Sequence, residues 1–570
     1  MDRRGPPLRR SGPAGRPGPT SFLASGALLV APLAFLAVFF VAPIVAILSR
    51  GLTDEQGVDL SPLVELVTDP SQRGVAWFTL WQAAVSTVLT VVAAMPMAYV
   101  LARLSFPGKA IVRALIVVPF VLPTVVVGVA FLNFLGPNGP VSGVMGTLGV
   151  DDVDLRRTVP AVLIAHVFFN YAVIARTVGG TWARLDPAVT EAARTLGASS
   201  WRAFRTITLP ALGPTVVGAS TIVFLFTFTS FGVIKVLGGP QIATIEVEIH
   251  RLTTELLDLR AAAALSLLQM LTVVALLAFA YRSPSSKVGA FGTTGRDHDR
   301  RPRGGQWWVL GATLSTAAIL LVLPVASLVE RSFATDDGYG LAFYRSLSTT
   351  GRGTTGFVAP TEAIGNSLVF GLAAAGIAMV LGLLISLAIV SLGSRTGRVA
   401  DTAFALPLGT SAVTLGFGFL IALDEPPLDL RTSPLLIPAA QALIAMPFVV
   451  RTLLPALRGI DPRLREASAT LGATPRRTRW EVDVRLMLAP LLVAVGFALA
   501  ISLGEFGATV FIARADAPTV PVAIFRSLSR PGSLNFGRAM AMSTVLMVLT
   551  ASVMLLVDRA RTADAVGSLA

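Results

Sequence analysis

The chain has 570 residues, of which 54% are hydrophobic and only 14% are charged, and it contains no cysteine. A water-soluble protein of this size needs more charge to cover its surface, so the composition indicates a membrane protein. The lack of cysteine excludes disulfides, thiolate metal sites and cysteine nucleophiles, and the net charge of +13 has to be explained by its distribution along the chain.

The chain starts with a polar tail and continues as a series of apolar blocks. Residues 1–21 are rich in Pro, Gly and Arg, which predicts a disordered basic tail. A helix needs about 20 apolar residues to span a bilayer. Twelve blocks approach this length, near 22–49, 78–102, 112–135, 158–175, 213–236, 262–281, 307–329, 363–392, 401–423, 434–450, 488–512 and 538–557. The sequence therefore predicts an all-α polytopic integral membrane protein with about 12 transmembrane helices.

The charges between these blocks predict an orientation. With twelve spans and a cytoplasmic N-terminus, the predicted cytoplasmic segments carry more Lys and Arg than Asp and Glu, and the external loops show the reverse. This distribution follows the positive-inside rule. We expect both termini in the cytoplasm and interpret the net positive charge as a sign of topology rather than of nucleic-acid binding.

The two halves of the chain repeat each other at a spacing of 275 residues. Residues 186–198 and 461–473 are identical at eight of thirteen positions, and the register continues from 229–234 over 504–509. Each half holds six predicted spans, so the halves share one orientation and form a parallel repeat. We expect a first half at 22–281 with its core near 77–281, a cytoplasmic linker at 282–306, a second half at 307–558 with its core near 362–558, and a C-terminal tail at 559–570.

A polar motif lies between the fourth and fifth predicted spans of each half. The copies read "EAARTLGASSWRAFRTITLP" from Glu191 and "EASATLGATPRRTRWEVDVR" from Glu466. Asp186 and Pro187 indicate a helix start, and Gly197 indicates a helix end. The pattern predicts a short helix on the cytoplasmic membrane surface, which either docks on a partner or only anchors the neighbouring spans. Two copies at matched spacing favour docking.

The spacing of Glu-Ala-Ala, Gly and Leu-Pro resembles the hallmark of the inner-membrane permeases of bacterial type I ABC importers. The resemblance implies a pseudo-dimer of two type I permease halves in the plasma membrane, with each motif forming a coupling helix on one subunit of an ATPase dimer. The docking residues that it implies are Glu191, Ala192, Ala193, Gly197 and Pro210 in the first copy, and Glu466, Ala467, Ser468 and Gly472 in the second.

The second copy departs from this pattern at its end. Pro210 is expected to redirect the first copy into the fifth span, whereas Val484 and Arg485 replace Leu-Pro in the second copy. A bend is therefore in doubt there, with Pro490 as an alternative position. On this basis we expect the two dockings to differ mechanically.

Fused two-halved permeases of this kind resemble the thiamine and ferric-iron importers, as "TLWQAAVSTVL" at 79–89 and "LIAHVFFN" at 163–170 illustrate. The resemblance implies a small cargo such as thiamine or ferric iron, delivered by an external substrate-binding protein. Maltose, sulfate and polyamine permeases share the fold. No G-x-x-x-x-G-K-[ST] motif occurs, so we expect no catalysis and no cofactor in this chain, with ATP hydrolysed by a partner.

Several polar residues in apolar blocks are candidates for the translocation path. Glu505 aligns with Ser230 of the first half, and an intramembrane carboxylate usually faces a cavity or a polar partner. Glu505 is thus either an acid suited to a cationic cargo or a structural hydrogen-bonding group. His166 and Asn170 share a helix face, and Gln441 takes the place of His166 in the second half. These three either contact cargo or join helices.

Two other classes of function are weaker alternatives. Twelve spans in two parallel halves also describe ion-coupled secondary transporters of the major-facilitator type, but Glu505 and Lys235 are the only intramembrane charges that suit coupling, and neither is repeated. The cytoplasmic motif has no role in that class. A membrane enzyme would need a clustered catalytic set, and the three His residues are scattered at 166, 250 and 298.

Overall fold

The apolar blocks of this chain fold as long helices that pack along one another. The computed structural model describes residues 19–54, 57–150, 153–282, 299–335, 338–349, 358–392, 394–424 and 429–567. Ten helices in these ranges are long and apolar enough to cross a membrane: Gly26–Leu52, Pro70–Arg103, Val159–Arg184, Ser200–Phe228, Leu259–Ala278, Gln306–Phe333, Pro360–Ser391, Leu436–Gly459, Arg476–Gly504 and Ser533–Val557. They coincide with ten of the twelve predicted spans, and the all-α polytopic class is confirmed.

The other two predicted spans are sharply bent helix pairs. Helices α5 (Lys109–Val121) and α6 (Thr124–Phe134) meet at 104°, and the segment Thr396–Gly409 meets α20 (Ala412–Ala422) at 91°. Proline explains the first corner, because Pro123 disfavours the helical conformation of Leu122, whose ψ is 137°. If each pair counts as one span, the total is 12.

Apart from α7, which has no counterpart among the described residues of the second half, the two halves contain matching helices in the same order. The first half holds α3 (Ser61–Thr68), α4 (Pro70–Arg103), α5, α6, α7 (Pro140–Thr147), α8 (Val159–Arg184), α9 (Pro187–Thr195), α10 (Ser200–Ala203), α11 (Leu209–Phe228), α12 (Gly232–Leu237), α13 (Ile245–Thr254) and α14 (Leu259–Arg282). The second half holds α17 (Ala342–Ser346), α18 (Pro360–Ser391), α19 (Ser394–Ala405), α20, α21 (Leu436–Gly459), α22 (Pro462–Thr470), α23 (Pro475–Thr478), α24 (Arg485–Gly504), α25 (Thr509–Ile512), α26 (Val520–Leu528) and α27 (Ser533–Gly567). The parallel repeat read from the sequence is thus a structural repeat.

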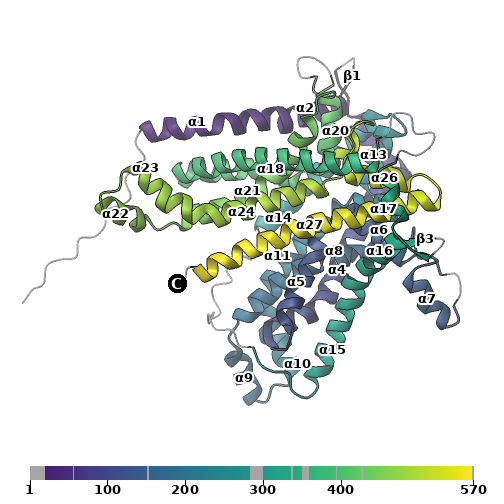
Figure 1. Cartoon of the computed structure of the whole chain (residues 1–570), viewed down its shortest axis with the longest axis horizontal. Helices are drawn as coiled ribbons and strands as arrows, with labels where there is room; N and C mark the ends of the chain where they lie inside the picture. The colour runs from purple at the N-terminus through teal and green to yellow at the C-terminus, as the bar shows by residue number, and fades with distance from the viewer. Residues whose placement is uncertain are drawn as a thin grey trace, which may run out of the picture.

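The first helix of each half packs against the other half. Helices α1 (Pro19–Leu36) and α2 (Ala42–Leu52) open the chain, and α1 lies along α18 while α2 contacts α20 as well as α14. Helices α15 (Gln306–Ala317) and α16 (Leu323–Phe333) open the second half and lie against α4 and α6. This exchange ties the two halves together at their outer faces (Figure 1).

A short antiparallel hairpin follows each of these opening helices. Strand β1 (Thr53–Asp54) pairs with β2 (Gly57–Val58), and β3 (Ala334–Thr335) pairs with β4 (Gly338–Tyr339). A short helix follows each hairpin, α3 in the first half and α17 in the second.

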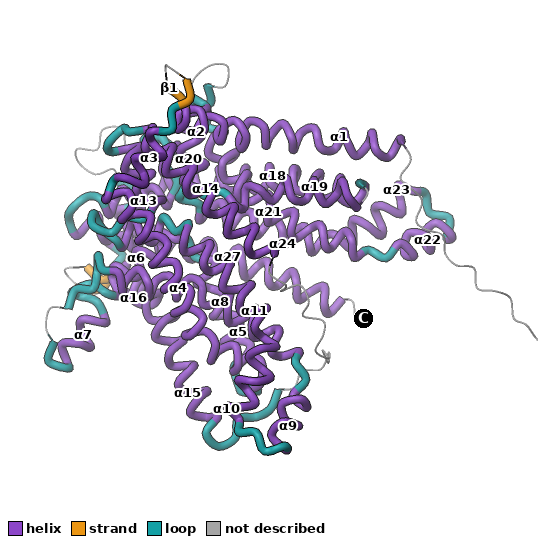
Figure 2. The backbone as a smooth tube through the Cα atoms, turned by 180° about the vertical axis from the view of Figure 1, so that it is seen from behind, coloured by secondary structure: helices purple, strands orange, loops and turns teal. Residues whose placement is uncertain are grey.

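The molecule has two arms that join at one end. Figures 1 and 2 show α9 at the tip of one arm and α22 at the tip of the other, with α13 and α20 at the joined end, where Figure 1 also shows α26. The predicted flexible linker lies mostly outside the described residues, but its last part is ordered. There Arg300 forms a parallel bridge with Leu104, and its N–H donates to the Arg103 carbonyl at 3.0 Å.

Candidate functional site

The first copy of the polar motif forms a short helix, a tight turn and a second helix. The Asp186 carboxylate accepts a hydrogen bond from the Ala188 N–H at 2.9 Å and caps α9, which starts at Pro187. At the other end Gly197 has φ of 90°, a left-handed conformation that glycine adopts without strain. The Ser199 hydroxyl then caps the next helix by accepting from the Arg202 N–H.

The second copy repeats this geometry. The Asp461 carboxylate accepts from the Arg463 N–H at 2.9 Å at the start of α22, and Gly472 has φ of 82°. The turns close in the same way, because Ala198 N–H donates to the Ala193 carbonyl and Ala473 N–H donates to the Ser468 carbonyl. The predicted docking residues therefore occupy equivalent places in the two halves.

The expectation that Pro210 redirects the chain is wrong. The helix that starts at Ser200 continues through a π-helical segment, Phe204–Thr208, into α11 without a break. Proline is tolerated here because it stands in the first turn of α11, directly after the π-helical segment. The second copy has the same arrangement at Arg479–Val484, so Arg485 in place of proline does not remove a bend.

Apolar side chains on these motifs face solvent at matched positions, which the sequence reading overlooked. Leu196 is 89% exposed and Leu471 is 88% exposed, and the two residues are 275 positions apart. Val189 and Leu464, also 275 apart, are about half exposed. Neither α9 nor α22 contains a buried residue. Single exposed apolar side chains are common on protein surfaces, so the informative feature here is their repetition at equivalent positions of the two copies.

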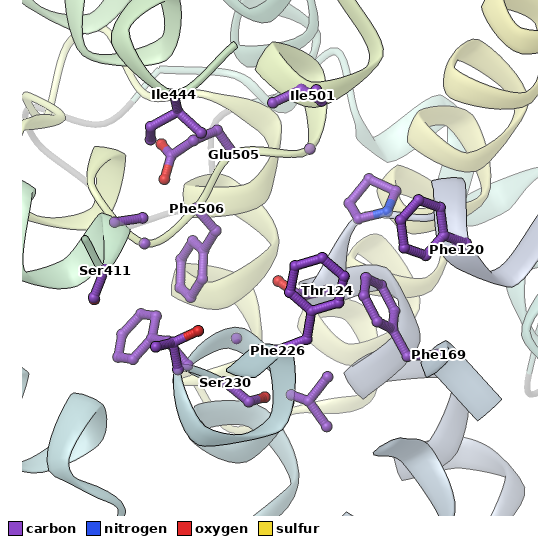
Figure 3. Close-up of a pocket in the computed structure, with 18 of the residues that line it drawn as sticks. Phe120, Thr124, Phe169, Phe226, Ser230, Ser411, Ile444, Ile501, Glu505 and Phe506 are labelled. Atoms are coloured by element: carbon purple, nitrogen blue, oxygen red, sulfur yellow. The ribbon is translucent and has the colours of Figure 1, made fainter. Parts of the chain in front are cut away.

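A cavity of about 420 Å³ lies where the two arms join. Its walls come from both halves, and seven of the lining residues are phenylalanines: Phe120, Phe169, Phe226, Phe231, Phe448, Phe497 and Phe506. Figure 3 shows Phe120, Phe169 and Phe226 on one side of it and Glu505 and Ser411 on the other. No Lys or Arg is among the described residues that line it. The space is thus aromatic and acidic in character.

Four of the five residues predicted for the translocation path border this cavity: His166, Asn170, Ser230 and Glu505. Gln441 is buried in α21 and is not among the described lining residues. Ser230 and Glu505 stand where the long helices end, at Phe228 and Gly504, rather than within them. The prediction that Glu505 lies inside a span is therefore corrected: it stands at a helix break.

The hydrogen bonds of Glu505 are structural. Its carboxylate accepts from the Ala508 N–H at 2.7 Å and from the Thr509 N–H at 3.0 Å, at the start of α25. His166 also joins elements of the first half, since its two ring nitrogens lie 3.1 Å from the Ser86 Oγ and 2.9 Å from the Ser230 Oγ. Asn170 donates to the His166 carbonyl, and its own carbonyl oxygen is buried without a partner among the described residues.

The sequence reading missed a second acid at the cavity, Glu246 on α13. Its carboxylate accepts hydrogen bonds from the Ser411 hydroxyl at 2.7 Å and from the Gln269 amide. Burial raises the pKa of Glu246 to about 7, and the two hydrogen bonds offset only part of that effect. The repeat register could have drawn attention to this residue, because its equivalent in the second half is Pro521.

A row of four rings crosses from one half to the other beside the cavity. His250 packs on Phe231 and Phe525 packs on Phe506, each pair with 5.5 Å between ring centroids, and Phe231 stacks on Phe506 between them. Burial and the nearby Lys235 ammonium lower the pKa of His250 to about 3, so the imidazole is neutral at physiological pH. Lys235 itself lies over the Phe525 ring and pairs with Glu255 at 3.4 Å.

Comparisons with known proteins agree with this architecture. Residues 90–285 match the family model described as "Binding-protein-dependent transport system inner membrane component". The chain is 28% identical to the thiamine transport system permease protein ThiP of Brucella abortus, covering 85% of this chain and 87% of that one. It is 27% identical to ThiP of Escherichia coli, covering 79% and 82%. A probable ABC transporter permease protein of Sinorhizobium fredii, y4fN, is 25% identical over 91% of this chain and 94% of its own length.

Proposed function

Since this chain belongs to the binding-protein-dependent inner-membrane permeases of ABC importers, we propose that it translocates a small aromatic cation of the thiamine class. Its relatives from Brucella abortus and Escherichia coli are named as thiamine transport permeases. A major-facilitator mechanism is not favoured, because these relatives are permease subunits of another class.

The composition of the cavity walls is the observation that carries this proposal. Seven phenylalanine rings and the carboxyl groups of Glu246 and Glu505 line the space where the two halves meet. The face of an aromatic ring attracts cations, and the attraction strengthens when water is excluded. A flat cation such as a thiazolium would stack on these rings while a carboxylate balances its charge.

Other cargo classes fit these walls less well. An oxyanion such as sulfate needs cationic or N–H donors, and no Lys or Arg is found among the described lining residues. Ferric iron needs a cluster of hard oxygen ligands. Among the described residues no group of three or more His, Asp and Glu side chains is placed to hold a metal ion.

Two ATPase subunits supplied by a separate chain would dock on α9 and α22. Both helices stand at the tips of the arms, both carry a glutamate and small residues at equivalent positions, and each is followed directly by an exposed leucine. The arms diverge toward these tips (Figure 2). Closing of an ATPase dimer would draw the tips together and so change access to the cavity, to which an external binding protein delivers cargo. The termini would lie on the ATPase side of a bacterial plasma membrane.

Reconstitution tests the proposed function. The permease, its ATPase and its binding protein are placed in liposomes, and uptake of radiolabelled thiamine is followed with and without ATP. We expect uptake that requires ATP and that is competed by other thiazolium or pyridinium compounds but not by sulfate. Uptake of sulfate or of ferric citrate in preference to thiamine would refute the assignment.

A pair of charge reversals tests the docking surface. Glu191→Lys combined with Glu466→Lys should abolish co-purification of the ATPase, because both copies then oppose the docking. Asp516→Lys is the matched control, since it makes the same charge change at an exposed carboxylate outside both motifs. Equal ATPase recovery in the two variants would place the docking surface elsewhere.

A further inference from the structure

We propose that Glu246 is the cation-recognising residue of the cavity, which gives the transporter its preference for a positively charged cargo. This inference rests on the proposed function in one respect, namely that the cavity lies on the transport path. It distinguishes Glu246 from two other buried carboxylates nearby, Glu248 and Glu505.

The other two carboxylates are already satisfied. Glu248 pairs with Arg251 through two N–H···O contacts of 2.8 and 3.0 Å. Glu505 accepts from two backbone N–H groups and thereby holds the start of α25. Glu248 is therefore balanced by a positive charge, and both oxygens of Glu505 are held by backbone N–H groups, which cannot turn toward a ligand as side chains can.

Glu246 has only neutral partners. It is fully buried, borders the cavity, and is hydrogen-bonded to the Ser411 hydroxyl and the Gln269 amide. Among the described residues it has no ion-pair partner. A buried carboxylate without a positive partner is costly in its ionised form, so a cation that enters the cavity gains a strong interaction there.

The site is built from both halves but exists only once. Ser411 belongs to the corner of the second bent helix pair, whereas Glu246 and Gln269 belong to the first half. The 275-residue register puts Pro521 at the equivalent of Glu246, so the repeat supplies a single carboxylate. A cargo with one charged ring and one polar end fits this asymmetry.

An unpaired polar atom elsewhere in the cavity wall indicates what the other end of such a cargo carries. The Asn170 side-chain carbonyl is buried, has no hydrogen-bond partner among the described residues, and belongs to a residue that lines the same cavity. A carbonyl oxygen accepts a hydrogen bond from an amine or amide N–H. We therefore expect the cargo to combine an aromatic cation with an N–H donor.

The test compares a cation with a neutral molecule of similar shape. Binding of N-benzylpyridinium and of 4-benzylpyridine at pH 8, where the latter is uncharged, is measured by calorimetry on the full chain in detergent. Glu246→Gln should weaken binding of the cation by about tenfold, which corresponds to ~1.4 kcal/mol. It should leave binding of the neutral compound within about twofold, and Glu246→Asp should keep most of the preference for the cation.

Glu248→Gln is the matched control on the same helix, because it removes a buried carboxylate that does not line the cavity. It should leave the ratio of the two affinities unchanged even if it lowers stability. A Glu246→Gln variant that loses both ligands equally, or neither, would overturn the proposal. If the reconstituted wild-type transporter fails to take up thiamine while this ratio still depends on Glu246, the proposed function fails and the cation site stands.

Discussion

The rings of Phe231 and Phe506 stack across the boundary between the halves, with 5.3 Å between their centroids and 24° between their planes. These residues are equivalent in the repeat, because they lie 275 positions apart. The pseudo-twofold axis of the molecule must therefore pass between them. Both rings are nearly fully buried and both border the cavity, so this contact joins the halves where the cavity ends.

The stack should be visible as an energetic coupling between the two phenylalanines. Leucine keeps most of the buried area but loses the ring–ring interaction, so Phe231→Leu and Phe506→Leu should together destabilise less than the sum of the single effects. We expect a coupling of about 0.5–1.5 kcal/mol in a double-mutant cycle. Denaturation of the purified permease measures it, and Phe224→Leu combined with Phe506→Leu serves as the additive control. Additivity in both cycles would mean that the stack contributes nothing.

Arg300 and Glu191 make the first docking motif different from the second. The Arg300 Nη1 lies 2.9 Å from the Glu191 Oε1, and both side chains are more than half exposed. An exposed pair of this kind contributes about 0–1 kcal/mol, so Arg300→Ala should hardly change the melting temperature. Arg300→Glu should instead repel Glu191 and weaken ATPase binding at that motif, most clearly at low salt. ATPase affinity measured against ionic strength checks this, and a large loss of stability in Arg300→Ala would contradict it.

The turns after α9 and α22 should respond equally to the loss of their glycines. Gly197 and Gly472 have positive φ, and a methyl group added at either would meet open space. Alanine there costs only backbone strain, about 1–2 kcal/mol. We expect Gly197→Ala and Gly472→Ala to lower stability by the same amount and to reduce coupling of ATPase activity to transport. Gly180→Ala, in a helical position that is also open, is the control and should be neutral or stabilising. Unequal effects would show that the two turns are not equivalent.

Gly416 and Gly496 both permit close packing against a neighbouring segment. We expect a second substitution to restore the stability lost on replacing one of them by alanine but not the other. A methyl group at Gly416 would lie 2.7 Å from the Ala508 Cα, whereas at Gly496 it would overlap a methyl group of Val557. Overpacking costs about 1–3 kcal/mol. We expect Val557→Ala to restore the stability of Gly496→Ala, because the obstacle is a side chain. No side-chain truncation should restore Gly416→Ala, whose obstacle is backbone. The measurement is thermal unfolding in detergent, and rescue of both, or of neither, would contradict this packing.

The sequence predicted the spans well because an apolar run of about 20 residues reports directly on burial in a bilayer. It did not predict the corner between α5 and α6, since the run at 112–135 is continuous and Pro123 alone is compatible with a mild kink. The sequence also could not predict that α1 packs on the second half and α15 on the first. Hydrophobicity identifies a spanning helix but does not say which helices pack against it. The 275-residue repeat did predict one structural relationship. It aligned Ser230 with Glu505, and both residues stand at equivalent helix breaks.

The residues that line the cavity were only partly predictable, because the sequence does not show which elements meet there. His166, Asn170 and Glu505 stood out as polar residues in apolar blocks. Glu246 lies outside every predicted span, in a stretch where polar and apolar residues alternate, and only the fold brings it to the cavity. Extending the repeat register to 246 and 521 would have shown a carboxylate that one half has and the other lacks.

The bridge from Ser86 through His166 to Ser230 favours the interhelical role among the two that the sequence allowed for His166. Both ring nitrogens lie within hydrogen-bond distance of serine hydroxyls, at 3.1 and 2.9 Å. His166→Phe should destabilise the permease by about 1–3 kcal/mol per hydroxyl left unpaired. The triple variant Ser86→Ala, His166→Phe and Ser230→Ala should recover most of that loss, because neither serine hydroxyl is then left without its partner. Denaturation together with thiamine uptake separates the roles: recovered stability with retained uptake supports an interhelical hydrogen bond, and recovered stability with uptake abolished would assign these residues to the translocation path.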